Sequence, residues 1–177
     1  DGFKEYQDGH IPRAVYFDID EISDHGTTLP HMLPPPEAFA LHMRRLGIGD
    51  GMTIVVYDGG GLFSAPRVWW TFRVMGHEDV AVLDGGLKKW KAEGRALEMG
   101  KQTLRHRHFT VWRDAKAVRT KEEMLALVSS GTPLFEPGTQ TSYSNSGYFL
   151  LGLILEKLTG KPYDQALEER INSKIGL

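Results

Sequence analysis

The chain has 177 residues, of which 41% are hydrophobic and 25% charged, and this predicts one domain, or one and a part, with an ordinary core. A formal net charge of −2 gives no global attraction to nucleic acid or to an anionic membrane, so neither is expected as a partner. Without cysteine, the chain has no disulfide, thiolate nucleophile or thiolate metal site. The apolar runs are too short for a membrane span of about 20 residues, and we expect a cytoplasmic protein.

Apolar runs alternate with amphipathic segments in the first half of the chain. The pattern predicts strands at residues 14–19, 53–57 and 80–83. It predicts helices at residues 36–46, 64–75 and 86–94, bounded by proline and glycine. Ser64 is expected to cap the second helix, and Trp69 and Trp70 to face the core. This order favours an α/β fold, with a mostly parallel sheet between helices on both faces.

The second half of the chain is organised differently. Residues 99–131 read as a linker and a helix, which Thr120 and Glu123 open with the spacing of a capping box. A boundary is expected near residue 131, where Pro, Gly and Thr become frequent. Two further helices follow, at residues 146–159 and 163–173, the first capped by Asn145 or Ser146. Apolar residues surround the first of them, so we expect self-association through these C-terminal helices.

A glycine-rich loop between the second strand and the second helix is the first candidate site. Its backbone N–H groups, together with the helix N-terminus, suit a small anion. The loop lacks the lysine of a phosphate-binding P-loop, and a plain flexible turn is the alternative. The candidate anion-binding residues are Asp58, Gly59, Gly60, Gly61 and Arg67.

Four stretches resemble the N-terminal domain of two-domain rhodanese-type sulfurtransferases, particularly 3-mercaptopyruvate sulfurtransferases. They are residues 10–20 (HIPRAVYFDID), 31–34 (HMLP), 56–70 (VYDGGGLFSAPRVWW) and 82–86 (VLDGG) followed by Trp90, and the resemblance extends over residues 5–130. It implies a rhodanese-like parallel sheet in residues 1–98, lacking an early strand at its N-terminus. It also implies the non-catalytic member of a pair of domains.

The resemblance assigns roles to three residues. Asp58 stands where the catalytic domain has its cysteine, and a carboxylate cannot carry a sulfane sulfur. Asp20 and His31 match positions that lend groups to the cleft between the domains. Alternatively, Asp20 only caps a turn and His31 only anchors the proline-rich loop. We expect this chain alone to be inactive in sulfur transfer.

Residues 132–177 resemble the serine hydrolases that include class C β-lactamases, esterases and penicillin-binding proteins. Tyr143 and Asn145 match the family's Tyr-x-Asn motif, and residues 175–177 resemble the segment after its second helix. The resemblance implies a tyrosine that moves a proton and an asparagine that orients substrate. No serine is followed three residues later by lysine, so this fragment also lacks its nucleophile. A loop before a helix is the alternative.

Three hypotheses follow for the whole chain. It is a non-catalytic sulfurtransferase domain, a fragment of a serine hydrolase, or an interaction module that presents the Asp58 loop. No complete catalytic set is present and no cofactor is expected. His106 and His108 alternate like metal ligands, but no third ligand is evident and no metal site is expected.

Overall fold

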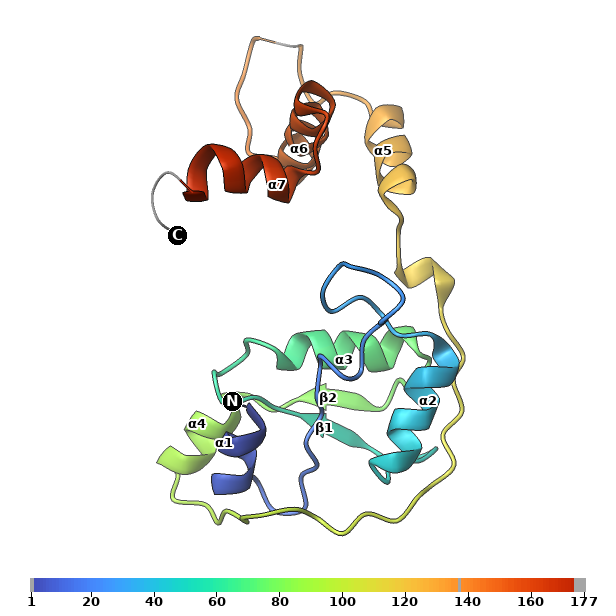
Figure 1. Ribbon diagram of the computed structural model, residues 1–177, viewed down its shortest axis with the longest axis vertical. Coiled ribbons are helices and arrows are strands. Elements are labelled where there is room, and N and C mark those ends of the chain that lie inside the picture. Colours follow the sequence, from blue (N-terminus) through green and yellow to red (C-terminus); the bar gives the residue numbers. More distant parts are fainter. Residues whose placement is uncertain (1, 137, 174–177) are drawn as a thin grey trace. The chain divides into compact units, whose positions relative to one another are not determined.

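The computed structural model describes residues 2–136 and 138–173 and divides into two compact units, one ending at Val118 and the other beginning at Arg119 (Figure 1). The first unit contains α1 (Gly2–Asp8), α2 (Pro36–Arg45), β1 (Ile54–Val56), α3 (Ala65–Val74), β2 (Val80–Val82), α4 (Gly86–Ala92) and a 3₁₀ turn (Ala115–Ala117). The second contains α5 (Lys121–Ser130), α6 (Asn145–Thr159), α7 (Tyr163–Leu167) and a π-helical turn (Glu168–Asn172). Each unit is described by itself.

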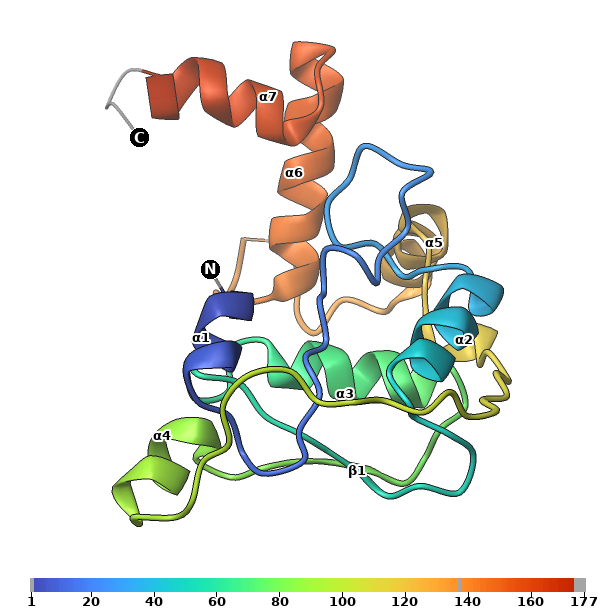
Figure 2. The ribbon, with the colours of Figure 1, turned by 60° about the horizontal axis from the view of Figure 1, so that its bottom comes forward.

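The first unit is built around a short parallel sheet. β1 and β2 pair with Val55 opposite Ala81, and α3 packs against both strands (Figures 1 and 2). Aromatic side chains from α2, α3 and the later extended segment meet beside the sheet. The Phe39 and Phe72 rings lie 5.3 Å apart and the Phe39 and Phe109 rings 5.8 Å apart, and all three side chains are buried. The predicted α/β class and parallel sheet are confirmed.

One predicted strand is absent. Residues 14–18 have no regular secondary structure and residue 19 begins a turn, although this stretch is as apolar as a strand. Strand propensity describes how a segment packs beside a paired neighbour, and here the described sheet consists of β1 and β2 alone. The prediction at residues 53–57 is confirmed by β1, and the prediction at residues 80–83 by β2.

The predicted ends of α2 and α3 are confirmed, and Ser64 occupies the N-cap position of α3 as predicted. Pro36 occupies the first position of α2, and Gly76, with a φ of 87°, follows the end of α3. The Ser64 side chain makes no capping hydrogen bond. The carboxylate of Asp58, from the preceding loop, accepts the backbone N–H groups of Ser64 and Ala65.

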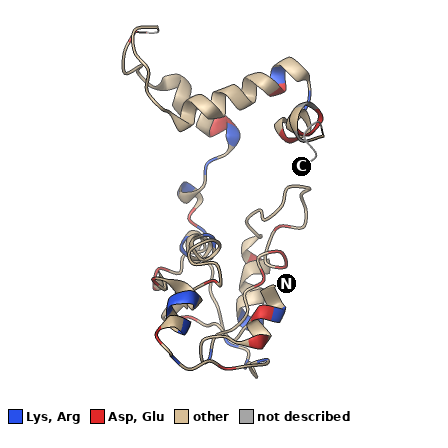
Figure 3. Cartoon of the chain, turned by 90° about the vertical axis from the view of Figure 1, so that its left-hand side faces the viewer, with Lys and Arg blue, Asp and Glu red and all other residues tan. Residues whose placement is uncertain are grey.

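The second unit is helical. Thr120 and Glu123 form the predicted capping box at the start of α5. At α6 the cap is Ser144, whose hydroxyl accepts the Gly147 N–H, rather than Asn145 or Ser146. α6 carries no charged side chain before Glu156 (Figure 3). The motif at residues 175–177 lies outside the described residues.

Apolar side chains of α6 are exposed within the second unit, as the sequence predicts. Leu158 is 78% exposed and Leu151 55% exposed. Among the residues that the structure describes, no helix combines the length and the apolar character that crossing a bilayer requires. α7 packs against α6 but leaves part of the apolar surface of this short helix exposed within its own unit.

Candidate functional site

The Asp58 loop is folded around its own carboxylate. One oxygen of Asp58 accepts the Gly61 N–H at 2.6 Å, and the other accepts the N–H groups of Ser64 at 2.8 Å and Ala65 at 2.9 Å. The backbone carbonyl of Asp58 accepts the Leu87 N–H at 3.2 Å. Three backbone N–H groups that we expected to bind an external anion therefore donate to the Asp58 carboxylate.

The hydrogen bonds set the ionisation of this carboxylate. Burial by itself raises the pKa of Asp58, but the N–H donors of Ala65, Ser64 and Gly61 outweigh burial and hold its pKa below the ordinary value. Asp58 is therefore a carboxylate at neutral pH. The loop can hold a negative charge, and its resident charge is the Asp58 side chain.

Asp20, His31 and Arg67 form a connected group, although they come from distant parts of the sequence. The His31 Nε2 atom lies 2.9 Å from an Asp20 carboxylate oxygen. The Arg67 guanidinium donates to the His31 carbonyl oxygen at 2.6 Å. His31 has a φ of 56°, which is uncommon for a residue other than glycine and often marks a functional segment. The sequence named all three residues but did not link Arg67 to the other two.

The Asp58 loop and this connected group line the same cavity, of about 990 Å³. Both signs of charge face it, since four arginines and four carboxylates are among its lining residues. They are Arg13, Arg67, Arg105, Arg107, Glu5, Asp18, Asp20 and Asp58. The net charge of the lining residues therefore does not favour an anion over a cation in this cavity. Binding of an anion would depend on guanidinium groups with N–H donors directed into the cavity.

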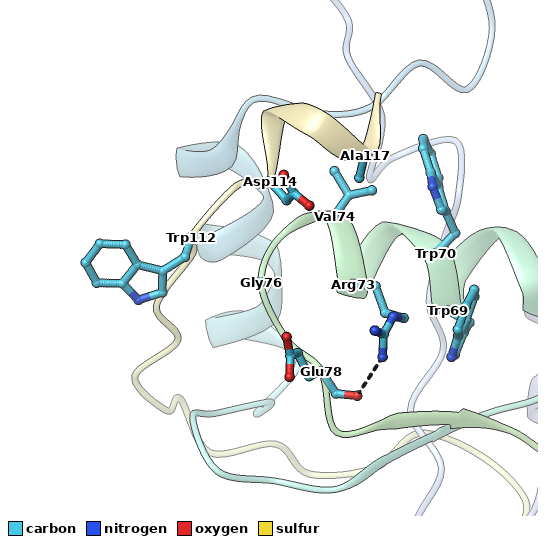
Figure 4. A pocket seen from close by; sticks show the side chains of 9 residues that line it. All are labelled: Trp69, Trp70, Arg73, Val74, Gly76, Glu78, Trp112, Asp114 and Ala117. Carbon is cyan, nitrogen blue, oxygen red and sulfur yellow. Dashed lines mark hydrogen bonds between the residues drawn. The ribbon is translucent and has the colours of Figure 1, made fainter. Parts of the chain in front are cut away.

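A second cavity, of about 450 Å³, lies beside the C-terminal half of α3 and shares no lining residue with the first (Figure 4). Arg73 lies with its guanidinium carbon 5.4 Å from the Trp69 ring centre and donates to the Glu78 carbonyl at 3.4 Å. Trp112 points away from the other labelled side chains and is 78% exposed (Figure 4). No sequence pattern indicated this cavity.

Trp70 is the residue near the site that sequence reasoning misjudged. Trp69 packs against the core as expected, and its indole N–H donates to the Val80 carbonyl at 3.0 Å. Trp70 does not belong to the core cluster; the guanidinium carbon of Arg67 lies 4.7 Å from its ring centre. The signal was present as an arginine and a tryptophan three residues apart on one helix.

In the second unit, Tyr143 and Asn145 interact directly. The Tyr143 hydroxyl donates to the Asn145 side-chain oxygen at 3.0 Å, and Tyr143 is 77% exposed. The predicted motif is thus assembled locally, at the start of α6. It faces no activated serine within the described residues, because the sequence contains no Ser-x-x-Lys.

These groups can bind and orient a ligand, but they supply no sulfur nucleophile. Sulfane sulfur transfer requires a thiolate that attacks and later leaves, and the chain has no cysteine. Among the described residues, no group of three His, Asp or Glu side chains is placed to hold a metal ion. The chemistry open to the cavity is ion pairing and hydrogen bonding through Arg67, His31 and Asp20.

Two family descriptions match the sequence. The rhodanese-like domain matches residues 2–93, and the beta-lactamase family matches residues 87–177. Among similar proteins, thiosulfate/3-mercaptopyruvate sulfurtransferase 1, mitochondrial, of Arabidopsis thaliana is 61% identical over 95 residues, covering 54% of this chain and 25% of that protein. The 3-mercaptopyruvate sulfurtransferase of Escherichia coli K12 is 49% identical over 115 residues, covering 65% and 41%.

Solved structures agree with the first of these matches. The crystal structure of SseA from Escherichia coli, titled a 3-mercaptopyruvate sulfotransferase, superposes with a TM-score of 0.70 at 44% identity, covering 72% of this chain and 49% of that one. The chain thus spans between a quarter and about half of these proteins. From the fold and these matches together, the chain belongs to the rhodanese-like domain family.

Proposed function

We propose that this chain is the non-catalytic, cleft-forming part of a 3-mercaptopyruvate or thiosulfate sulfurtransferase and that it transfers no sulfur alone. One observation is the main support for the proposal. Asp20, His31 and Arg67 are connected by an ion pair and a hydrogen bond, and they line the same cavity as the Asp58 loop. The similarity to sulfurtransferases supports the substrate class. The absence of cysteine supports the lack of turnover.

In this proposal Arg67 is the anion-binding group. Mercaptopyruvate and thiosulfate are anions, and a guanidinium binds such oxygens through paired N–H donors. Arg67 is exposed, and a guanidinium that donates to the His31 carbonyl has further N–H donors for a ligand. The Asp58 carboxylate fills the loop in which a catalytic domain would place its thiolate.

The test measures thiocyanate formation from thiosulfate and cyanide, and pyruvate formation from 3-mercaptopyruvate, by the purified chain. We expect no protein-dependent turnover in either assay. Thiosulfate should nevertheless shift the NMR signal of the Arg67 side-chain N–H, and Arg67→Ala should weaken binding at least threefold, since charge-assisted hydrogen bonds are lost. Turnover by the chain, or binding that is indifferent to Arg67, would refute the proposal.

We propose separately that the segment from residue 132 onward is a β-lactamase-like fragment without activity. The beta-lactamase match over residues 87–177 and the hydrogen bond between Tyr143 and Asn145 support it. A fluorescent penicillin should leave no covalent label on the chain. A labelled serine, located by peptide mass spectrometry, would show that a nucleophile exists and would contradict this part of the proposal.

The cytoplasm is the compartment that we propose. The absence of cysteine is its sequence support, whereas the name of the Arabidopsis relative assigns that protein to mitochondria. Fractionation of cells that express the tagged natural protein would decide between the two compartments. Recovery with mitochondria would overturn the cytoplasmic assignment without affecting the proposed role of Arg67.

A further inference from the structure

Trp70 and Arg67 are neighbours on one face of α3. They are three residues apart on the helix, and the guanidinium carbon of Arg67 lies 4.7 Å from the centre of the Trp70 ring. At that distance the ring attracts the cation and also restricts the plane of the guanidinium. Arg67 would otherwise be an exposed side chain with many rotamers. The stack therefore selects one direction for its donors.

That direction leads to the His31 carbonyl. The guanidinium donates to this oxygen at 2.6 Å, and the His31 ring in turn pairs with Asp20 at 2.9 Å. His31 holds its carbonyl in place with a positive φ of 56°, a conformation that costs free energy for a residue with a side chain. A strained residue persists only where surrounding contacts favour it, and the Arg67 donor is one such contact.

A comparable pair elsewhere in the unit has no such consequence. Arg95 lies with its guanidinium carbon 5.0 Å from the Trp90 ring centre, but its side chain pairs with Glu93 and neither Arg95 nor Trp90 lines the cavity of the Asp58 loop. The Trp70 stack differs because its cation reaches a cavity-lining segment. The Trp70 ring also borders the second cavity, which Arg67 does not line (Figure 4).

We propose that Trp70 is a positioning residue, which holds Arg67 in the orientation that both anchors His31 and presents the guanidinium to an anionic ligand. The proposal rests on the proposed function, because it assumes that Arg67 binds the anion. Trp70 itself touches no ligand. Its effect is on the geometry of Arg67, so it should alter affinity and the Arg67 spectrum together.

The test uses the whole chain with thiosulfate as the probe, at constant ionic strength. Trp70→Leu should weaken thiosulfate binding about two- to fivefold, the range expected for loss of one exposed cation–π contact. It should also move and broaden the Arg67 Nε–H signal, because the ring no longer shields or orders it. Trp70→Phe, which keeps an aromatic face, should restore most of both properties. The matched control Trp90→Leu should leave both unchanged.

The outcomes separate this inference from the proposed function. If Arg67→Ala weakens binding but Trp70→Leu does not, Trp70 is not a positioning residue and the proposed function stands. If Arg67→Ala has no effect either, the proposed function fails. Equal losses in Trp70→Leu, Trp70→Phe and Trp90→Leu would indicate a general packing defect and would also overturn the inference. Should Trp70→Leu fail to fold, Trp70→Phe against Trp70→Met, which has an uncharged side chain without an aromatic ring, gives the same comparison.

Discussion

The two units of this chain differ in how much of their apolar surface they bury. The first unit buries aromatic side chains from three segments beside a small sheet, and Phe39, Phe72 and Phe109 are at most 1% exposed. In the second unit, Ala166 is the buried apolar residue among those that the structure describes, while Leu151 and Leu158 stay exposed. Regular helices are present in both. The difference shows that a helix can be well capped and strongly apolar without belonging to a core.

The contrast also concerns function. The first unit joins residues that are distant in sequence, such as Asp20 and Arg67, whereas the Tyr143–Asn145 contact of the second unit is local. A site made of distant residues depends on the tertiary fold, so it reports on the fold's integrity. A contact between residues two positions apart requires only local backbone geometry. The first unit is therefore the better candidate for a site with a selected geometry.

The largest expected effect comes from the core of the first unit. Phe72→Ala should cost about 3–5 kcal/mol of unfolding free energy, because it removes a buried ring and leaves a cavity. Leu158→Ala in the second unit should cost less than about 0.5 kcal/mol, since that side chain is already in water. Urea titration followed by Trp fluorescence and far-UV circular dichroism measures both. Equal costs would show that Leu158 is buried in solution and would break the comparison.

Asp58 should give the next largest effect. Asp58→Ala leaves the N–H groups of Gly61, Ser64 and Ala65 without their acceptor, and we expect a loss of about 1–3 kcal/mol. The same urea titration measures it, with Asp84→Ala as a control, because Asp84 pairs with an exposed lysine. If Asp58→Ala is no costlier than Asp84→Ala, the carboxylate does not organise the loop.

The pH dependence follows from the lowered pKa of Asp58. Since the folded-state pKa lies below the unfolded value of about 3.9, the Asp58 contribution is fully present above that value and is lost as pH falls through the folded-state pKa. Asp58→Asn, which has no charge to lose, should show a shallower decline in stability below about pH 4. The free energy of unfolding would be measured by urea titration at a series of pH values. The same decline below about pH 4 in both proteins would contradict the assigned hydrogen bonds.

The smallest expected effect concerns association. We propose that copies of the chain associate weakly through α6, because its side chains Leu151, Ile154, Leu155 and Leu158 are exposed within their unit. Leu158→Lys should shift sedimentation toward the monomer at concentrations where the wild-type chain associates. Lys157→Glu, at a neighbouring position, is the control for charge alone. A wild-type chain that is monomeric at all concentrations would remove this proposal.

Local patterns in the sequence predicted most of the elements. The run at residues 53–57 and the capping box at Thr120 are decided by neighbours within a few residues, and both are confirmed. The strand predicted at residues 14–19 is absent because a strand also needs a paired neighbour, which no local pattern reveals. Ser64 is the N-cap residue of α3, but its side chain makes no capping hydrogen bond: such a bond would serve Pro66, which has no N–H, or Arg67, whose N–H is bonded to the Ser64 carbonyl oxygen.

The sequence was enough to name the residues of the candidate site, but not to predict the contacts between them. Asp20 and His31 were named through family resemblance, and Arg67 through its position after the glycine loop. Their connection depends on a contact between residues 36 positions apart, which spacing alone does not specify. The misplacement of Trp70 has a similar origin: an indole on an amphipathic helix suggests core packing, and the nearby guanidinium decides otherwise.

The central claim is that the Asp58 carboxylate occupies a loop built to hold a negative charge, where sulfur chemistry would need a thiolate. Asp58→Cys tests it most directly, with thiosulfate as donor and mass spectrometry as readout. The introduced thiolate should attack the outer sulfur, forming a sulfur–sulfur bond while sulfite leaves with the electron pair, so the protein gains one sulfur atom. The wild-type chain should gain none, and Ser130→Cys, on the exposed end of α5, should react much more slowly. Equal reactivity of the two cysteine variants, or sulfur on the wild-type chain, would contradict the account.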